Sequence, residues 1–243
     1  MNAIMKQLAI QFRMDLRDKG ILLTYYIVPL LFYAVVGAVF SSINPLSRLT
    51  LTGAMSIFAV SMGAVIGIPA PLVSLRENGA LRAYKVNGIP GWAVLLVTAS
   101  SAFLHLSIVT AIISITGPRL FGASVPAHIG WYIVIMAILL FTSICVGLMI
   151  GSVAKNQPAS VMLSQGVFLP SLMLGGIMFP ADMLPSTLRQ AGLIFPATHA
   201  MNSFRMLAYQ LPGSDHLISL FVLAGIGIAA LFVAVIRFQS SSR

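Results

Sequence analysis

Long apolar stretches without a single Asp, Glu, Lys or Arg occupy most of this 243-residue chain. Six of them occur, at residues 21–40, 49–75, 86–118, 120–154, 156–181 and 216–236, and each is at least 20 residues long. A helix of about 20 residues crosses the roughly 30 Å hydrocarbon core of a bilayer. None of the stretches alternates apolar and polar residues as the strands of a membrane barrel do. The pattern therefore predicts an all-α integral membrane protein.

Prolines, glycines and charges bound six expected transmembrane helices, at about 21–40, 53–73, 93–116, 130–152, 159–179 and 217–236. Pro29 is expected to kink the first span, and Gly117-Pro118 is expected to end the third. Two spans carry small residues at four-residue spacing, which allows close helix approach. These are Ala59, Gly63 and Gly67 in span two, and Gly147 and Gly151 in span four. Such faces fit either packing within the chain or a seam between two copies.

The first 20 residues have the period of an amphipathic helix. Their apolar residues fall on one side of a helical wheel: Met5, Ala9, Phe12 and Leu16, with Leu8 at the edge. Their basic residues fall together on another side: Lys6, Arg13 and Arg17. We expect a helix in the membrane interface with its basic side toward anionic headgroups, followed by a bend at Gly20. The alternative is a cytoplasmic extension of the first span.

Residues 180–216 are apolar but broken by four prolines: Pro180, Pro185, Pro196 and Pro212. The segment is too apolar for a solvated loop and too interrupted for a span. We expect short re-entrant helices that dip into the outer leaflet and pack against the bundle. Together the elements form one domain, residues 1–243, with six transmembrane helices, an N-terminal amphipathic interfacial helix and short re-entrant helices after the fifth span.

The formal net charge is +9, and the basic residues flank apolar spans. They are therefore expected to set the membrane orientation and not to bind nucleic acid. Placing both termini in the cytoplasm puts ten basic residues inside: Lys6, Arg13, Arg17, Lys19, Arg76, Arg82, Lys85, Lys155, Arg237 and Arg243. It leaves four outside: Arg48, Arg119, Arg189 and Arg205. This asymmetry and the even number of spans predict that both termini are cytoplasmic.

Few residues have the character needed for enzymatic chemistry. All five acidic residues are expected outside the spans: Asp15, Asp18, Glu77, Asp182 and Asp215. This argues against a transporter coupled to protons or sodium, which typically keeps ionisable groups at mid-membrane. The sequence has no Walker-type phosphate loop and no metal-ligand spacing. The single cysteine, Cys145, is expected to be a small buried hydrophobe.

His105 is the one ionisable side chain near the middle of a span. We expect it to hydrogen-bond a neighbouring helix, and the alternative is a polar contact on a transport pathway. A proton relay would need an acidic partner at similar depth, and the expected topology offers none. Phe168 and Met173 are further pathway candidates, although such residues more often face lipid or the bundle core.

The cytoplasmic loop between spans two and three, residues 74–90, is the most specific candidate site. Ser74 and Glu77 have the S-x-x-E spacing of a capping box, which would start a short helix. Apolar and charged side chains follow one another along it: Leu75, Arg76, Leu81, Arg82, Tyr84 and Lys85. A short rigid helix with mixed faces suits docking onto a partner protein. The alternative is a basic loop that only sets topology.

These features resemble the permease subunits of ABC-2 type transporters. In that family the loop after span two commonly reads Arg-Glu-x-Gly-x-Leu-x-x-hydrophobic and then Pro, which is matched by Arg76, Glu77, Gly79, Leu81, Tyr84 and Pro90. A second signature follows span five, and it is matched by Gly176, Phe179, Pro180, Leu184, Pro185, Pro196, Thr198 and Arg205. The resemblance covers essentially the whole chain.

The resemblance implies a permease subunit of an ATP-driven exporter in the bacterial cytoplasmic (inner) membrane. It implies a homodimer or heterodimer in which each copy pairs with a separate ATPase subunit that holds ATP and Mg²⁺, while this chain binds no cofactor itself. Coupling to the ATPase would fall on Ser74, Arg76, Glu77, Gly79, Leu81, Arg82, Tyr84 and Lys85. The extracytoplasmic gate would include Gly176, Phe179, Pro180, Pro185, Pro196 and Arg205.

The uncharged spans favour a hydrophobic or amphipathic cargo such as a drug, peptide or lipid-like molecule. Large family members carry a long domain between spans one and two, whereas this loop has about 12 residues, so a handover of substrate to an external machine loses support. Two other functions remain open at this point. One is an ATP-independent channel or carrier, and the other is a membrane scaffold or immunity protein that binds a toxin without moving it.

Overall fold

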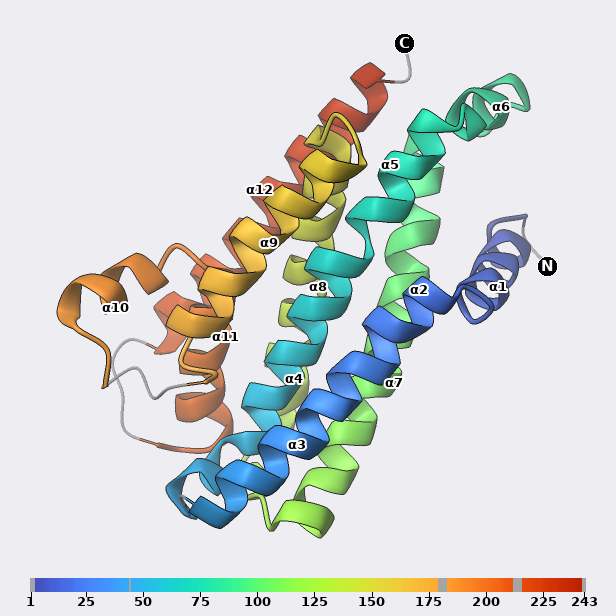
Figure 1. Ribbon diagram of the computed structural model, residues 1–243. Coiled ribbons are helices and arrows are strands. Elements are labelled where there is room, and N and C mark those ends of the chain that lie inside the picture. The colour runs from blue at the N-terminus through green and yellow to red at the C-terminus, as the bar shows by residue number, and fades with distance from the viewer. Residues whose placement is uncertain (1–2, 44, 179–182, 212–215, 242–243) are drawn as a thin grey trace.

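The computed structural model describes residues 3–43, 45–178, 183–211 and 216–241, and no strand occurs within them. The first half contains α1 (Ala3–Asp15), α2 (Lys19–Leu22), η1 (Leu23–Ile27), α3 (Val28–Ile43), η2 (Pro45–Leu49), α4 (Leu51–Ser61), η3 (Met62–Gly67), α5 (Pro69–Glu77) and α6 (Ala80–Val86). The second half contains α7 (Gly91–Phe121), α8 (Ile129–Val153), α9 (Gln157–Leu174), α10 (Ser186–Gly192), α11 (Pro196–Ser203), η5 (Phe204–Ala208) and α12 (His216–Ser241). The helices form one elongated bundle, with α6 at one end and α10 near the other (Figure 1).

Five helical segments in the described chain are long and apolar enough to cross a membrane. They are Lys19–Ser42, Leu51–Glu77, Gly91–Phe121, Ile129–Val153 and Leu217–Gln239. The expected fifth span appears as α9, an 18-residue helix whose apolar character is reduced by serines, glutamines and Pro170. α9 runs along the bundle beside the longer helices (Figure 1). The membrane class is confirmed, and a sixth crossing by α9 stays a prediction.

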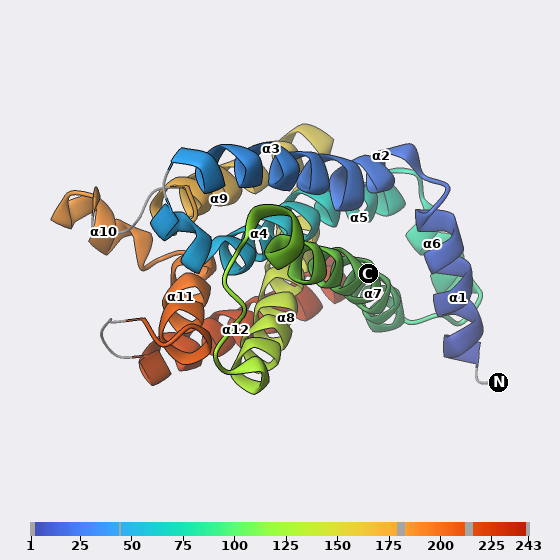
Figure 2. The same ribbon diagram turned by 90° about the horizontal axis from the view of Figure 1, so that it is seen from below.

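α8 is the central helix of the bundle. It packs most extensively on α12 and also contacts α5, η3 and α7. Viewed from below, it lies among α12, α11, α4 and α7 (Figure 2). Side chains with no exposed surface meet in this core: Ile57, Leu106, Ile135, Leu139 and Leu223. The core therefore joins helices from both halves of the chain.

The two small-residue faces pack within the chain. A Cβ atom on Gly147 of α8 would collide with the backbone carbonyl oxygen of Ala64 in η3. A Cβ atom on Gly63 of η3 would collide with the side chain of Leu106 in α7. These glycines therefore allow close packing between helices of the same chain, and not a seam between two copies.

The end of α7 differs from the expectation. The helix continues past Gly117-Pro118 to Phe121, with Pro118 inside it. A proline at this position removes one backbone hydrogen bond, which transmembrane helices tolerate. Gly122 then adopts a left-handed conformation with φ of 60° and stops the helix.

The bend after α1 also lies earlier than expected. It occupies Leu16–Asp18 and not Gly20, which belongs to the first turn of α2. The Asp18 carboxylate accepts hydrogen bonds from the amides of Gly20 at 2.8 Å and Ile21 at 3.1 Å. Asp18 is therefore the N-cap that starts the next helix.

The segment expected to re-enter the membrane contains the short helices α10 and α11, each starting at a proline step. α11 is buried and packs on α12, α8 and α4. α10 stands out to one side of the bundle (Figure 1). The interrupted helical structure is confirmed, whereas entry into the bilayer stays a prediction.

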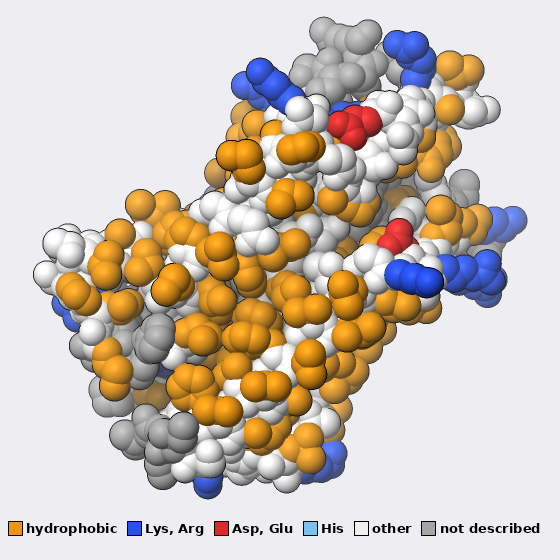
Figure 3. All heavy atoms as spheres, in the orientation of Figure 1, with side chains coloured by type: hydrophobic (Ala, Val, Ile, Leu, Met, Phe, Trp, Pro, Cys, Tyr) orange, Lys and Arg blue, Asp and Glu red, His pale blue; other side chains and the backbone are white. Residues whose placement is uncertain are grey.

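The surface of the bundle is apolar along its middle. Figure 3 shows hydrophobic side chains over most of the face drawn, with Lys and Arg at its margins. Large apolar side chains stand exposed on several long helices: Leu31, Leu169, Phe221 and Phe232. Such a surface is suited to lipid, and the helices beneath it bond their backbone groups internally, as a lipid environment requires.

Gly147→Ala is expected to lower the free energy of unfolding by about 1–3 kcal/mol, because the facing carbonyl belongs to the backbone and has little room to retreat. Thermal unfolding of the purified protein in detergent measures this. Gly130→Ala on the same helix is the control, since nothing lies within 4 Å of the added methyl group. Equal unfolding temperatures for the two variants would contradict the close contact between α8 and η3.

Candidate functional site at the α6 end of the bundle

The segment expected to be one coupling helix is built from two helices. α5 continues from the second span as far as Glu77, and α6 starts at Ala80 after a break at Asn78-Gly79, where Gly79 has φ of 71°. Ser74 and Glu77 lie in the last turn of α5. The capping-box prediction is therefore wrong, because these residues end a helix whose amides already bond within it.

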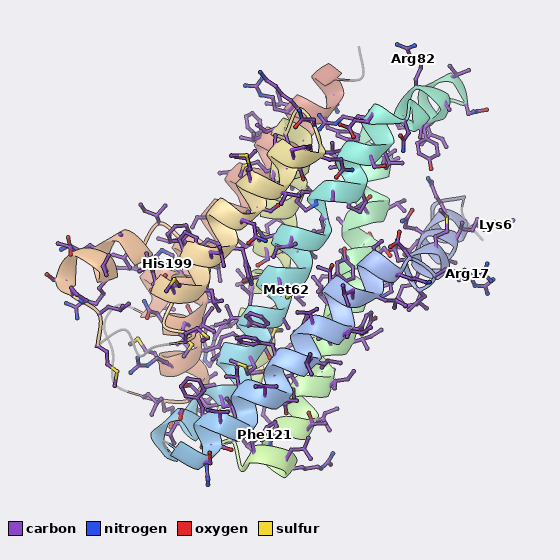
Figure 4. All side chains as sticks on the ribbon, viewed as in Figure 1. Lys6, Arg17, Met62, Arg82, Phe121 and His199 are labelled. Carbon is purple, nitrogen blue, oxygen red and sulfur yellow. The ribbon has the colours of Figure 1, made fainter. Side chains whose placement is uncertain are left out.

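α6 projects from the end of the bundle (Figure 1). Its Leu81 side chain is buried and anchors the helix, Tyr84 is half-buried and Arg82 is exposed. Figure 4 shows the Arg82 side chain on α6, directed away from the other helices. Lys85 belongs to α6, and Gly88, with φ of 76°, turns the chain toward α7. The helix therefore presents an exposed arginine on an apolar anchor.

Arg76 was expected to offer charge to a partner, but it is bound within the bundle. Its guanidinium donates hydrogen bonds to the carbonyl oxygens of Ser152 at 3.0 Å, Gly151 at 2.8 Å and Ala154. These carbonyls lie at the C-terminal end of α8, where they have no partner in their own helix and where a cation is favoured by the helix dipole. Arg76 therefore joins α5 to α8.

Glu77 makes a similar connection to α9. Its carboxylate accepts a hydrogen bond from the backbone amide of Gln157 at 3.4 Å. The side-chain amide of Gln157 donates to the carbonyl oxygen of Ala70 at 3.0 Å. Together with Arg76, these contacts brace α5, α8 and α9 at the end from which α6 projects.

A buried polar cluster joins α1 to α7. The Ser101 hydroxyl donates to the Asp15 carboxylate at 2.5 Å, and Nε2 of His105 lies 3.7 Å from the same carboxylate oxygen. All three side chains are buried. The expectation that no acidic group reaches the depth of His105 is therefore wrong. The sequence did carry a signal, since Asp15 follows Phe12 by three residues and so lies on the same face of α1.

The other ring nitrogen of His105 confirms the expected hydrogen bond to a neighbouring helix. Nδ1 lies 2.7 Å from the Tyr26 hydroxyl of η1. The Phe12 ring stacks on the imidazole with centroids 4.2 Å apart and an interplanar angle of 5°. His105 therefore contacts both α1 and the start of the first span.

The three residues predicted for a pathway do not form one lining. Phe168 of α9 is buried, with its ring centroid 5.8 Å from that of Phe58 in α4. Met173 of α9 is 56% exposed. His105 is enclosed on α7, on the other side of α4 (Figure 1). A role of Phe168 and Met173 in transport stays a prediction.

The described residues of the predicted gate lie away from the α6 end. Gly176 has φ of 75° in the turn after α9, Pro185 precedes α10, Pro196 opens α11 and Arg205 lies in η5. Two more gate candidates fall outside the described residues: Phe179 and Pro180. The gating role stays a prediction.

Several known proteins are similar to this chain. The inner membrane transport permease YhhJ of Escherichia coli K12 is 24% identical over 184 residues, which cover 75% of this chain and 49% of the relative. The probable multidrug ABC transporter permease YbhS of the same strain is 24% identical over 160 residues, covering 65% of this chain and 42% of YbhS. ABC transporter G family member 20 of Dictyostelium discoideum is 32% identical over 88 residues, or 35% of this chain and 12% of that protein.

The chain thus spans at most about half the length of these curated relatives. The family model described as ABC-2 type transporter matches residues 4–209, which include nearly all of α1, the α6 end, α10, α11 and η5. Because this match covers most of the chain, the protein belongs to the ABC-2 type transporter family.

Proposed function

We propose that this chain is the permease subunit of an ATP-driven exporter in the bacterial inner membrane. A separate ATPase subunit, which binds ATP and Mg²⁺, would dock on α6 and the adjoining end of α5. Membership of the ABC-2 family and the relatives named as permeases support this proposal. The observation that carries it is α6 itself, a projecting helix anchored by Leu81 and carrying the exposed Arg82.

The connections of α6 suit the transmission of movement. Short turns join it to two long helices, at Asn78-Gly79 on the α5 side and at 87–90 on the α7 side. A push on α6 would therefore act on both spans. The contacts of Arg76 and Glu77 would carry it on to α8 and α9. This chain would supply a pathway and a mechanical linkage, and the ATPase would supply the hydrolysis.

The proposed docking fixes the orientation. If α6 lies in the cytoplasm and α9 crosses the membrane in addition to the five long helices, the chain has six crossings. Both termini would then be cytoplasmic, in agreement with the distribution of basic residues. The outer gate would then comprise the turn after α9 together with α10, α11 and η5. Two permease copies, identical or different, would enclose the pathway. The exposed apolar residues Met162 and Met173 of α9 fit a hydrophobic or amphipathic cargo.

Arg82→Glu is expected to weaken binding of the ATPase by about tenfold, or about 1.4 kcal/mol, because it reverses an exposed charge in the proposed interface. The measurement is the dissociation constant of the complex between the purified chain and its candidate ATPase subunit. Arg189→Glu on α10 reverses an exposed charge away from α6 and serves as the control. Identical dissociation constants for both variants and the unmodified chain would refute docking on α6.

Arg76→Ala is expected to free the last carbonyls of α8 and to speed amide hydrogen exchange in residues 151–157, since three hydrogen bonds are lost together. Arg76→Lys should rescue little, because an ammonium group lacks the planar fork that reaches several carbonyls. Hydrogen exchange followed by mass spectrometry measures both. Arg82→Ala is the control, and exchange that is equally fast in Arg76→Ala and Arg82→Ala would show that Arg76 does not brace α8.

A further inference from the structure

The buried cluster around Asp15 is the polar attachment of α1 to the bundle. Within the described chain, both polar contacts between α1 and α7 use Asp15, one to Ser101 and one to His105. The second carboxylate oxygen accepts a hydrogen bond from Gln11 of α1 at 2.8 Å. A carboxylate taken out of water needs such partners, so α1 cannot leave α7 without breaking them together.

Open apolar space borders the contact between α1 and α7. Two apolar grooves of about 540 and 600 Å³ flank the helix. Leu8 of α1 and Leu104 of α7 line both grooves and therefore lie between them. Besides Leu8 in the middle of α1, the described contacts of α1 with α7 are the Phe12 ring on the imidazole of His105 and the Asp15 cluster at the last residue of α1.

His105 connects the cluster to more than one helix. The ionisable groups in contact with its ring are Asp15 from α1 and Tyr25 and Tyr26 from η1. Phe12 covers one face of the ring. The imidazole therefore lies where α1, η1 and α7 meet, and it is fully buried there.

α7 is also the helix that continues from α6. Only residues 87–90 separate the last residue of α6 from the first residue of α7. Ser101 and His105 lie one helical turn apart on the same side of α7, facing α1. A displacement of α6 that tilts or shifts α7 therefore reaches the two residues that hold Asp15.

We propose that Asp15 and His105 form a latch that locks α1 to α7, so that the interfacial helix moves together with α6. The proposal rests on the proposed function, in which the ATPase moves α6. Asp15 and His105 are positioning residues in this scheme. Lys6 and Arg17, which point away from the bundle in Figure 4, would be carried with α1 across the headgroup region during each cycle.

The test measures distances between spin labels on the full chain in lipid nanodiscs, in a Cys145→Ala background. One pair is Ile10→Cys on α1 with Val86→Cys on α6, at positions 59% and 82% exposed. A second pair, Val86→Cys with Ile236→Cys on α12, reports whether the rest of the bundle is intact. Without ATPase, Asp15→Asn and His105→Gln are each expected to broaden the first distance distribution roughly twofold and to leave the second unchanged.

Further variants separate the latch from general loosening. The double variant Asp15→Asn with His105→Gln should broaden the first distribution no more than the more disruptive single variant does. The reason is that both substitutions remove the same interaction, the contact between Asp15 and His105. Ser101→Ala, a milder change, should broaden it less. His128→Gln at the far end of α7 and α8 should not broaden it. A first distribution as narrow in Asp15→Asn as in His128→Gln would overturn the latch.

Adding the ATPase with ATP and Mg²⁺ tests the joint movement. In the unmodified chain the distance from α6 to α12 should change while the distance from α1 to α6 stays constant. In Asp15→Asn the distance from α6 to α12 should still change, and the distance from α1 to α6 should no longer stay constant. A distance from α1 to α6 that stays constant in Asp15→Asn would overturn the latch but not the proposed function. An α6 that never moves in the unmodified chain would overturn the proposed function and the joint movement with it.

Discussion

The carbonyl groups at the end of α8 have no partners in their own helix, and the guanidinium of Arg76 satisfies three of them. This interaction determines the form of the α6 end. α8 is the central helix, so a group fixed to its last turn is fixed to the core. Because Arg76 lies next to Glu77, the last turn of α5 is held to both α8 and α9. α6 can then project as a separate unit from a braced base.

Two sets of contacts lead away from α6. One runs through α5 to α8 and α9 by way of hydrogen bonds to backbone groups near the end of the bundle. The other runs through α7 to α1 by way of a buried carboxylate and an imidazole. The first is rigid and continuous with the core. The second depends on one small cluster beside apolar grooves. It is therefore the connection that one or two substitutions are enough to break.

The apolar pattern was sufficient for the membrane class and for five of the long helices, because a charge-free stretch has few alternatives in a bilayer. Local motifs were less reliable. Ser74 and Glu77 fit the spacing of a helix start, yet a continuous span runs through them. Gly117-Pro118 is typical of a helix end, yet α7 continues through it to Phe121. In both cases the helix already present took precedence over the local signal.

The site residues show the same limit for a different reason. Asp15 was expected outside the spans and Arg76 was expected to contact a partner, because charged side chains are seldom buried. Their actual partners, His105 and the end of α8, lie about 75 to 90 residues away in sequence. Spacing along the chain placed Asp15 on the same face of α1 as Phe12, but it does not identify a partner so far away in sequence. Leu81 and Arg82, whose environment depends mainly on α6 itself, match the expectation of a short helix that carries both apolar and basic side chains.

Cysteine cross-linking at Ala83, an exposed position on α6, tests the central claim most directly. Ala83→Cys in a Cys145→Ala background would be exposed to a membrane-impermeant maleimide and then to a short cross-linker in membranes that contain the ATPase. The account predicts labelling only from the cytoplasmic side and one cross-linked product that contains the ATPase. Labelling from the opposite side, or the absence of any product with the ATPase, would contradict it.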